Sequence, residues 1–303
     1  MLICQPNRIA PVGAPPTARQ SFTPLAARPL APGAQVEVLD FLALSPVHNV
    51  ALVSAIRDHG LVSPQHRGRF YCVRDEAGQL EGVALIGHAT LVAAETDRAL
   101  AAFARVARHT PRTHLIMGER EQVARFWQHF DADGTVEPRL AAREMLFTLG
   151  VAPPAVGQAT ALRQADPGDL DLVVPVQAEL ALADSGVNPL ETDPHGFRAR
   201  CALRVAQGRT WAVVEQGRLL FKAELQAVTP AAIYLEGIYV HPSVRGQGFG
   251  ARNLSQLCRT LLTRTDTLCL LVNEQHHAAQ QLYRKVGFRA EVCYDTIFLA
   301  HDC

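Results

Sequence analysis

The chain has 303 residues with 29 acidic and 29 basic side chains, so its formal net charge at pH 7 is zero. That balance gives no electrostatic case for binding nucleic acid or an anionic membrane. No stretch approaches the ~18 consecutive apolar residues of a membrane-spanning helix. The length suggests one large or two ordinary domains.

The seven cysteines form no CxxC pair, and Cys258 and Cys269 lie on apolar faces of their predicted elements. Small buried thiols of this kind are typical of a reducing compartment, and we expect a cytoplasmic protein. The twelve histidines include no HxxxH spacing and no mixed Cys/His cluster. The sequence therefore predicts no metal site.

The first half of the chain begins with a segment, residues 1–35, that is broken by prolines and predicted to be a disordered or loosely attached tail. After it we expect a helix over 49–60, a strand hairpin over 70–74 and 79–87, a helix capped by Thr96, a strand over 113–117 and a helix over 123–130. Pro153, Pro154 and Gly157 mark residues 151–160 as a linker.

The second half is predicted to begin with a strand at Ala161–Ala165 and a helix over 170–183 that tolerates Pro175. A loop over 184–193, a helix over 194–207, a hairpin over 210–215 and 218–227, and a strand over 232–240 follow. A helical stripe at Leu254, Leu257 and Leu261, a buried strand over 267–272 and a helix ending at Gly287 complete the pattern.

The order hairpin, strand, helix, strand, helix occurs before residue 150 and again after residue 160. We therefore predict a tandem arrangement in which the first half is a diverged relative of the second, although the same order fits many α/β domains. Between Gly87 and Leu100 the first half has no glycine loop, and Trp127 stands where the second half has Tyr283. A first half of this kind would lack the cofactor and act as a scaffold, a dimer surface or a wall of the substrate site.

The most specific motif is Arg245-Gly246-Gln247-Gly248-Phe249-Gly250, which lies between a predicted strand and a predicted helix. A strand, glycine-rich turn and helix in this order present backbone N–H groups and the positive end of a helix to a phosphate. The competing interpretation of such glycines is an ordinary turn.

With these flanks the sequence resembles the GCN5-related N-acetyltransferases, the GNAT superfamily. Arg245, Gly248 and Gly250 match the family's central motif, while Asn273 and the run Leu282-Tyr283-Arg284-Lys285-Val286-Gly287-Phe288 match its following strand and helix. The resemblance covers roughly residues 161–299. It implies an α/β (α+β) fold with tandem mixed-sheet domains: a GNAT-like domain over 36–150 without the cofactor loop, and a GNAT domain over 161–303 whose central sheet is splayed and flanked by helices.

The resemblance implies acetyl-CoA as the acyl donor. Its pyrophosphate would lie over Arg245, Gly246, Gln247, Gly248, Phe249 and Gly250. Its pantetheine arm would pair with the backbone at Ile238, Tyr239 and Val240, where the sheet splays and a bulge near Gly237 is expected. Asn273 would contact the same arm, and its alternative role is a helix cap.

Acetyl transfer to an amine needs a neutral nucleophile, and deprotonating a lysine-like amine of pKa ~10.4 at pH 7 costs roughly 4–5 kcal/mol. Glu236 is the candidate general base, and a solvated strand residue or ion-pair partner is the alternative. Tyr283 is the candidate acid, which would stabilise the leaving thiolate by a hydrogen bond, although it also belongs to the core stripe of its helix.

We therefore expect an acetyl-CoA-dependent N-acetyltransferase that acts on a primary amine of a small molecule or protein. It would have no nucleic-acid or membrane partner, and it could form a homodimer. The alternative from another class is a non-catalytic acyl-CoA-binding regulatory protein. In a third interpretation the first half is only a dimer scaffold.

Overall fold

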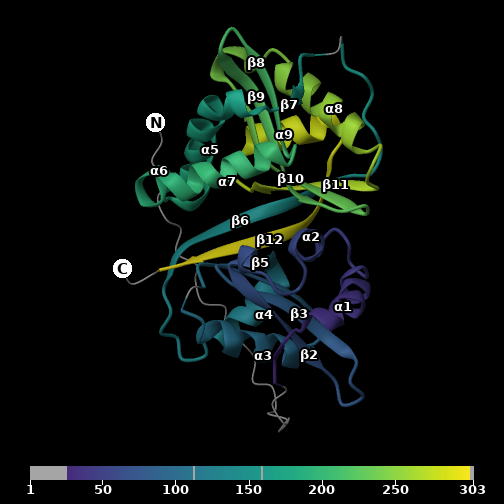
Figure 1. Ribbon diagram of the computed structural model, residues 1–303, viewed down its shortest axis with the longest axis vertical. Helices are drawn as coiled ribbons and strands as arrows, with labels where there is room; N and C mark the ends of the chain where they lie inside the picture. Colours follow the sequence, from purple (N-terminus) through teal and green to yellow (C-terminus); the bar gives the residue numbers. More distant parts are fainter. Residues whose placement is uncertain (1–25, 112, 158–159, 301–303) are drawn as a thin grey trace.

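The computed structural model describes residues 26–111, 113–157 and 160–300, and its strands form one mixed sheet (Figure 1). The strand order is β1-β2-β3-β4-β5-β12-β6-β11-β10-β9-β8-β7. Most of the predicted tail, residues 1–25, lies outside the described residues. The remainder is ordered, because β1 (Arg28–Pro29) pairs with β2.

The first half confirms the predicted hairpin and the predicted helix cap. The Thr96 hydroxyl accepts a hydrogen bond from the Ala99 N–H at 3.3 Å and begins α3. Two strands, β4 and β6, were not predicted. The elements after β1 are α1 (Gln35–Leu42), α2 (Val50–His59), β2 (Gly68–Arg74), β3 (Leu80–Gly87), β4 (Ala89–Ala94), α3 (Asp97–Arg108), β5 (Leu115–Glu119), α4 (Arg120–Phe130) and β6 (Pro138–Leu149).

The second half follows the predicted order, and α5 continues through Pro175. A short helix, α6, forms inside the predicted loop 184–193, and the final strand β12 was not predicted. The elements are β7 (Arg163–Gln164), α5 (Leu170–Ser185), α6 (Pro189–Thr192), α7 (Pro194–Ala206), β8 (Thr210–Glu215), β9 (Arg218–Val228), β10 (Ala232–Val240), α8 (Phe249–Leu261), β11 (Thr267–Asn273), α9 (His277–Val286) and β12 (Arg289–Leu299).

The predicted repeat is present, because β2-β3-β4-α3-β5-α4-β6 and β8-β9-β10-α8-β11-α9-β12 follow the same order. The two halves exchange their final strands. β12 pairs with β5 of the first half, with Tyr294 opposite Glu119, and β6 pairs with β11 of the second half, with Glu144 opposite Asn273. β6 and β12 also pair with each other, so the sheet is continuous across the molecule.

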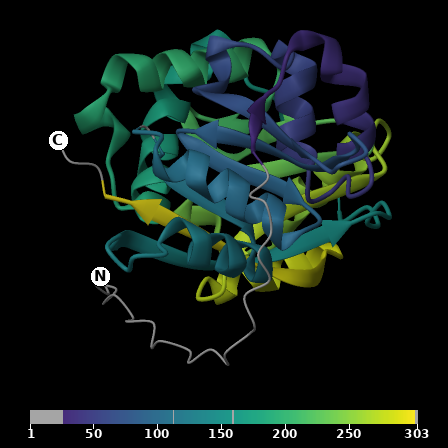
Figure 2. The same ribbon diagram turned by 90° about the horizontal axis from the view of Figure 1, so that it is seen from below.

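The helices form a layer on each face of the sheet. Figure 2 shows α1 and α2 (purple) on one side of the sheet and α3 and α4 (blue) on the other. Leu100 and Phe103 of α3 pack with Ala84 of β3, while Val38 of α1 packs with Val83, its neighbour on the opposite face. Because neighbouring residues of a strand point to opposite faces, β3 is buried on both sides.

The helix α2 also reaches the second half of the chain. The Ser54 hydroxyl accepts a hydrogen bond from the Val228 N–H at 3.0 Å, and Arg209 pairs with Asp58 at 2.6 Å. The two halves are therefore joined by the sheet and by one of its covering helices. Of the helices described, none has both the length and the apolar character needed to cross a membrane.

Candidate functional site

The glycine loop lies between the end of β10 and the start of α8, as predicted. Gly246 and Gly248 have φ of +74° and +75°, in the left-handed region that residues with a Cβ avoid. A Cβ at either position would have open space around it, so the backbone conformation and not crowding favours glycine. These two residues turn the chain so that α8 begins with its N–H groups directed at the loop.

The first turn of α8 has no side-chain cap, because its N-cap residue is Gly248. The uncapped N–H groups and the helix dipole together form an anion-binding end. Two side chains brace the loop, since Arg245 Nε donates to the Val240 carbonyl at 2.8 Å and Gln247 Nε2 donates to the Ser243 carbonyl at 3.0 Å. At Gly250 a Cβ would lie 2.9 Å from Val240 Cγ2, so a glycine lets α8 pack closely on β10.

The edge of β10 that faces β11 is open along its second part. The two strands pair only from Ala232 opposite Thr267 to Leu235 opposite Leu270, and then separate. On its other edge β10 has a register shift between Glu236 and Tyr239, with Gly237 at φ +58°. These observations confirm the predicted splay and the predicted bulge, and they leave backbone groups of residues 236–240 without a strand partner on the β11 side.

A buried cluster of charged side chains contacts the bulge. Lys222 Nζ, on β9, donates to the Gly237 carbonyl at 3.2 Å and lies 3.1 Å from Glu224. Arg204 of α7 also pairs with Glu224, and Gln177 of α5 accepts a hydrogen bond from Lys222. Both Lys222 and Glu224 are fully buried. Within this cluster Glu224 is the cross-strand partner of Glu236, and Lys222 and Arg204 are the basic groups that pair with it.

Glu236 is half-buried on the face of the sheet that α5 and α7 cover. Burial raises the pKa of its carboxyl, and the positive charges of Arg204 and Lys222 oppose that rise. The carboxyl therefore lies in a desolvated environment with cations nearby. Such an environment suits a group that accepts and returns a proton.

A second carboxyl, which sequence reasoning missed, comes from the exchanged strand β6. Glu144 lies opposite Asn273 on β11, and the hydroxyl of Thr296 donates to its Oε2 at 2.7 Å. Burial, with smaller contributions from the charges of Asp184 and Glu236, raises the pKa of Glu144 to about 7, and the hydrogen bond from Thr296 opposes this rise. The local sequence around Glu144 carries no signal for this role, because its position depends on a strand that crosses into the other half.

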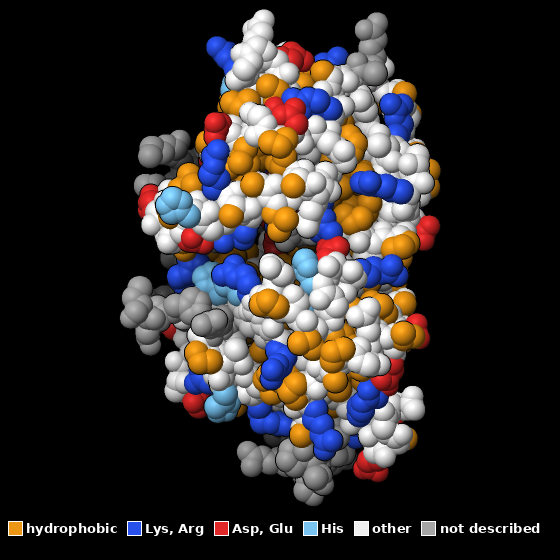
Figure 3. Space-filling view, viewed as in Figure 1, with side chains coloured by type: hydrophobic (Ala, Val, Ile, Leu, Met, Phe, Trp, Pro, Cys, Tyr) orange, Lys and Arg blue, Asp and Glu red, His pale blue; other side chains and the backbone are white. Residues whose placement is uncertain are grey.

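The charges of Asp184 and Glu236 raise the pKa of Glu144, and the charge of Asp184 raises the pKa of Glu236, so Glu144 and Glu236 both lie within electrostatic reach of Asp184. The space-filling view shows a recess at mid-height of the molecule, with acidic, basic and histidine side chains at its rim (Figure 3). The carboxylates among them attract cations. Within the parts of the chain described, no three His, Cys, Asp or Glu side chains are grouped as metal ligands would be.

Tyr283 and Asn273 both have structural roles. The Tyr283 ring is 7% exposed and packs edge-to-face against Phe147 and Phe288, and burial raises the pKa of its hydroxyl well above 10. The Asn273 side chain accepts a hydrogen bond from the Gln275 N–H at 2.9 Å, which shapes the turn before α9.

Comparison with known proteins agrees with this geometry. Residues 222–296 match the model of the FR47-like protein family, and residues 68–173 match a domain of unknown function, DUF4081. A tandem GNAT protein from the clavulanic acid biosynthesis pathway is 16% identical with a TM-score of 0.55, covering 92% of this chain and 100% of that one. The chain has a tandem GNAT fold.

Two further structures share this GNAT fold over nearly their whole length. A GNAT-family acetyltransferase from Colwellia psychrerythraea is 12% identical with a TM-score of 0.57, and the match covers 90% of this chain and 99% of that one. A Drosophila protein is 13% identical with a TM-score of 0.68, over 92% and 100% of the two chains. None of the curated proteins matches the sequence significantly.

The two copies of the GNAT fold differ at the position of the glycine loop. In the first half only Glu95 and Thr96 separate β4 from α3, and Thr96 caps the helix with its side chain. In the second half eight residues separate β10 from α8, and no side chain caps the helix. The anion-binding helix end is therefore a feature of the second GNAT copy.

Proposed function

We propose that the second half binds acetyl-CoA and transfers its acetyl group to a primary amine. The observation that carries this proposal is the combination of an open β10 edge with an uncapped α8 start, joined by two glycines of positive φ. The edge offers backbone hydrogen bonds to the amides of a pantetheine arm, and the helix end offers N–H groups to a pyrophosphate. Acetyl-CoA supplies an activated thioester carbonyl.

In this proposal Glu236 takes a proton from the ammonium form of the acceptor. The amine nitrogen then forms a bond to the carbonyl carbon, the carbon–sulfur bond breaks as the thiolate leaves, and the second proton of the nitrogen passes to that thiolate. Lys222 and Arg204 keep the Glu236 carboxylate available despite its burial. Glu144 provides a second proton-holding group in the same region, with a pKa of about 7. The Tyr283 hydroxyl, which burial keeps protonated, would donate a hydrogen bond to the thiolate.

The acceptor that this region favours is a cationic amine. The negative charges of Asp184 and Glu236 act on Glu144, and an ammonium group would be attracted to these carboxyls before Glu236 takes its proton and frees the nitrogen lone pair. A small molecule and an exposed lysine of a protein share this chemistry, so turnover has to be measured with amines of both kinds.

Thermal unfolding with and without acetyl-CoA tests the binding step. A ligand at 100 times its dissociation constant stabilises the native state by about 2.7 kcal/mol. We expect this stabilisation in the natural sequence and its loss in Gly248→Glu, which places a carboxylate at the helix end. Gly217→Glu is the matched control, because Gly217 also has a positive φ (+71°) with open space around it, but lies in the β8–β9 turn. Equal stabilisation in both variants would refute binding at this loop.

A non-catalytic acyl-CoA-binding regulator remains the second candidate, and the burial of Tyr283 in an aromatic cluster favours it. The two candidates differ in the effect of conservative variants on turnover. An acetyltransferase should lose most of its activity in Glu236→Gln and part of it in Tyr283→Phe, with acetyl-CoA binding retained. Cofactor binding without turnover on any amine would favour the regulator.

A further inference from the structure

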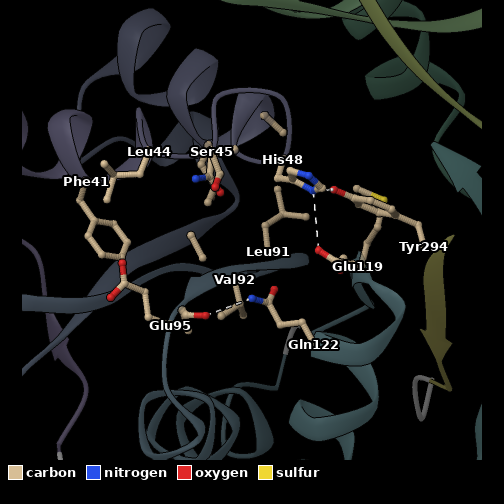
Figure 4. A pocket seen from close by; sticks show the side chains of 17 residues that line it. Phe41, Leu44, Ser45, His48, Leu91, Val92, Glu95, Glu119, Gln122 and Tyr294 are labelled. Carbon is tan, nitrogen blue, oxygen red and sulfur yellow. Dashed lines mark hydrogen bonds and ion pairs between the residues drawn. The ribbon is translucent and has the colours of Figure 1, made fainter. Parts of the chain in front are cut away.

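A second pocket lies in the first half of the chain, at the place that corresponds to the splay of β10 and β11. The strands β4 and β5 pair from Ala89 to Leu91 and then separate. A cavity of about 250 Å³ opens beyond that point, under the loop that joins α1 to α2 (Figure 4). None of the sites described above uses it.

The pocket has apolar walls and a polar end. Phe41, Leu44, Leu91 and Met117 are among the residues of its walls. At the polar end His48 Nδ1 lies 2.8 Å from the Tyr294 hydroxyl, and the two rings stack. The same nitrogen is 3.9 Å from Glu119 Oε2. Figure 4 shows these three side chains together on one side of the pocket.

The charged groups that line the pocket are acidic. Glu119 stands at the polar end, and Glu95 lies on the opposite side of the pocket in the close-up (Figure 4). No lysine or arginine is among the described residues that line it. A carboxylate attracts a cation and repels a phosphate or carboxylate ligand. Thr96 moreover caps the adjacent helix α3, whose N-terminus is therefore not open to a pyrophosphate.

We infer that this pocket binds a small organic cation, a primary amine that carries an apolar body. The ammonium group would donate hydrogen bonds to Glu119 and the Tyr294 hydroxyl. The apolar body would lie against Leu91, Phe41 and Met117. The pocket thus uses the position where the other GNAT copy has an open strand edge, but takes a ligand of opposite charge to a CoA phosphate. This inference is independent of acetyl transfer, because binding at the pocket requires no acyl donor.

Calorimetric titration without acetyl-CoA tests it with three ligands of similar shape and different charge: 2-phenylethylamine, 2-phenylethanol and phenylacetate. We expect the amine to bind at least about tenfold more tightly than the alcohol, the ratio given by one charge-assisted hydrogen bond, and phenylacetate not to bind. Equal affinity for amine and alcohol, tighter binding of phenylacetate, or no binding of the amine would each overturn the inference.

Three variants locate the site. Glu119→Gln should remove the preference for the amine, and Ser45→Trp should abolish binding by filling the mouth of the pocket. Both residues are partly or largely exposed, so both proteins should fold, which circular dichroism checks. Glu236→Gln is the control for the acetyl-transfer site and should leave this binding unchanged. Loss of amine binding in Glu236→Gln alone would place the ligand at the other site and refute the pocket.

Discussion

The carboxyl of Glu144 predicts an unusual dependence of stability on pH. Its pKa is about 7 in the folded protein against 4.5 for an unperturbed glutamate. Because the folded state binds this proton more tightly than the unfolded chain, protonated Glu144 contributes favourably to the free energy of unfolding at low pH. This contribution is lost as pH rises from about 4.5 to about 7.

The size of the effect follows from these two values. One pKa unit corresponds to about 1.36 kcal/mol, so ionising Glu144 in the folded protein costs roughly 3 kcal/mol in full, and about 2.5 kcal/mol of this falls between pH 5 and pH 8. Glu144→Gln has no proton to lose. Its free energy of unfolding relative to the natural sequence should therefore rise by about 2.5 kcal/mol between these pH values, which is about 5–10 °C in Tm.

Urea unfolding of both proteins at pH 5 and pH 8 measures this difference, and other titrating groups cancel because both proteins contain them. Thr296→Val provides a second measurement. It removes the hydroxyl that donates to Glu144 Oε2 and should raise the pKa of Glu144. In the Glu144→Gln background the same substitution should have no pH-dependent effect. If the free energies of unfolding of Glu144→Gln and the natural sequence differed by the same amount at pH 5 and pH 8, the raised pKa of Glu144 would be refuted.

Three further substitutions test a buried ion pair, the glycine of the bulge and a helix cap. Lys222→Met leaves Glu224 buried with one cation fewer, and urea unfolding should show a loss of about 3–5 kcal/mol; a loss below ~1 kcal/mol would mean that the pair adds little. Gly237→Ala would place a Cβ 2.9 Å from Lys222 Nζ at φ +58° and should destabilise more than Gly217→Ala, where only the positive φ matters; equal losses would rule out the contact. Thr96→Ala removes the cap of α3 and should lower the free energy of unfolding by about 1 kcal/mol, measured by thermal unfolding. Thr96→Ser should retain most of that stability, because serine also caps a helix.

The sequence predicted those features that depend on neighbouring residues. The glycine loop and the cap at Thr96 are set by local backbone preferences and lie where the pattern placed them, and the bulge at Gly237 lies where the resemblance implied it. The burial of Cys258 and Cys269 follows from their place on apolar faces. Glu236, predicted as the general base, is half-buried on β10 beside the splay, and its catalytic role stays a prediction.

Features that depend on distant pairing could not be predicted in this way. The strand β12 contains polar residues in its interior, such as Asp295, whose partner Arg120 lies in the other half of the chain. The strand exchange therefore leaves no local pattern in the sequence. Glu144 was missed for the same reason, because it lies on the exchanged strand β6. The residues between the predicted hairpin and the Thr96 cap were considered only as a loop without glycines, although Ala89–Ala94 form β4, whose second part lines the pocket of the first half.

The exchange of β6 and β12 also has a consequence for how the chain can be divided. If it were cut between residues 150 and 160, the first fragment would lack β12, which belongs beside its β5, and the second would lack β6, which belongs beside its β11. Each fragment would expose a sheet edge that matches a strand of the other, and such edges favour pairing between chains. Two such fragments, produced together, should therefore reassemble by trading strands, and each alone should be prone to aggregate.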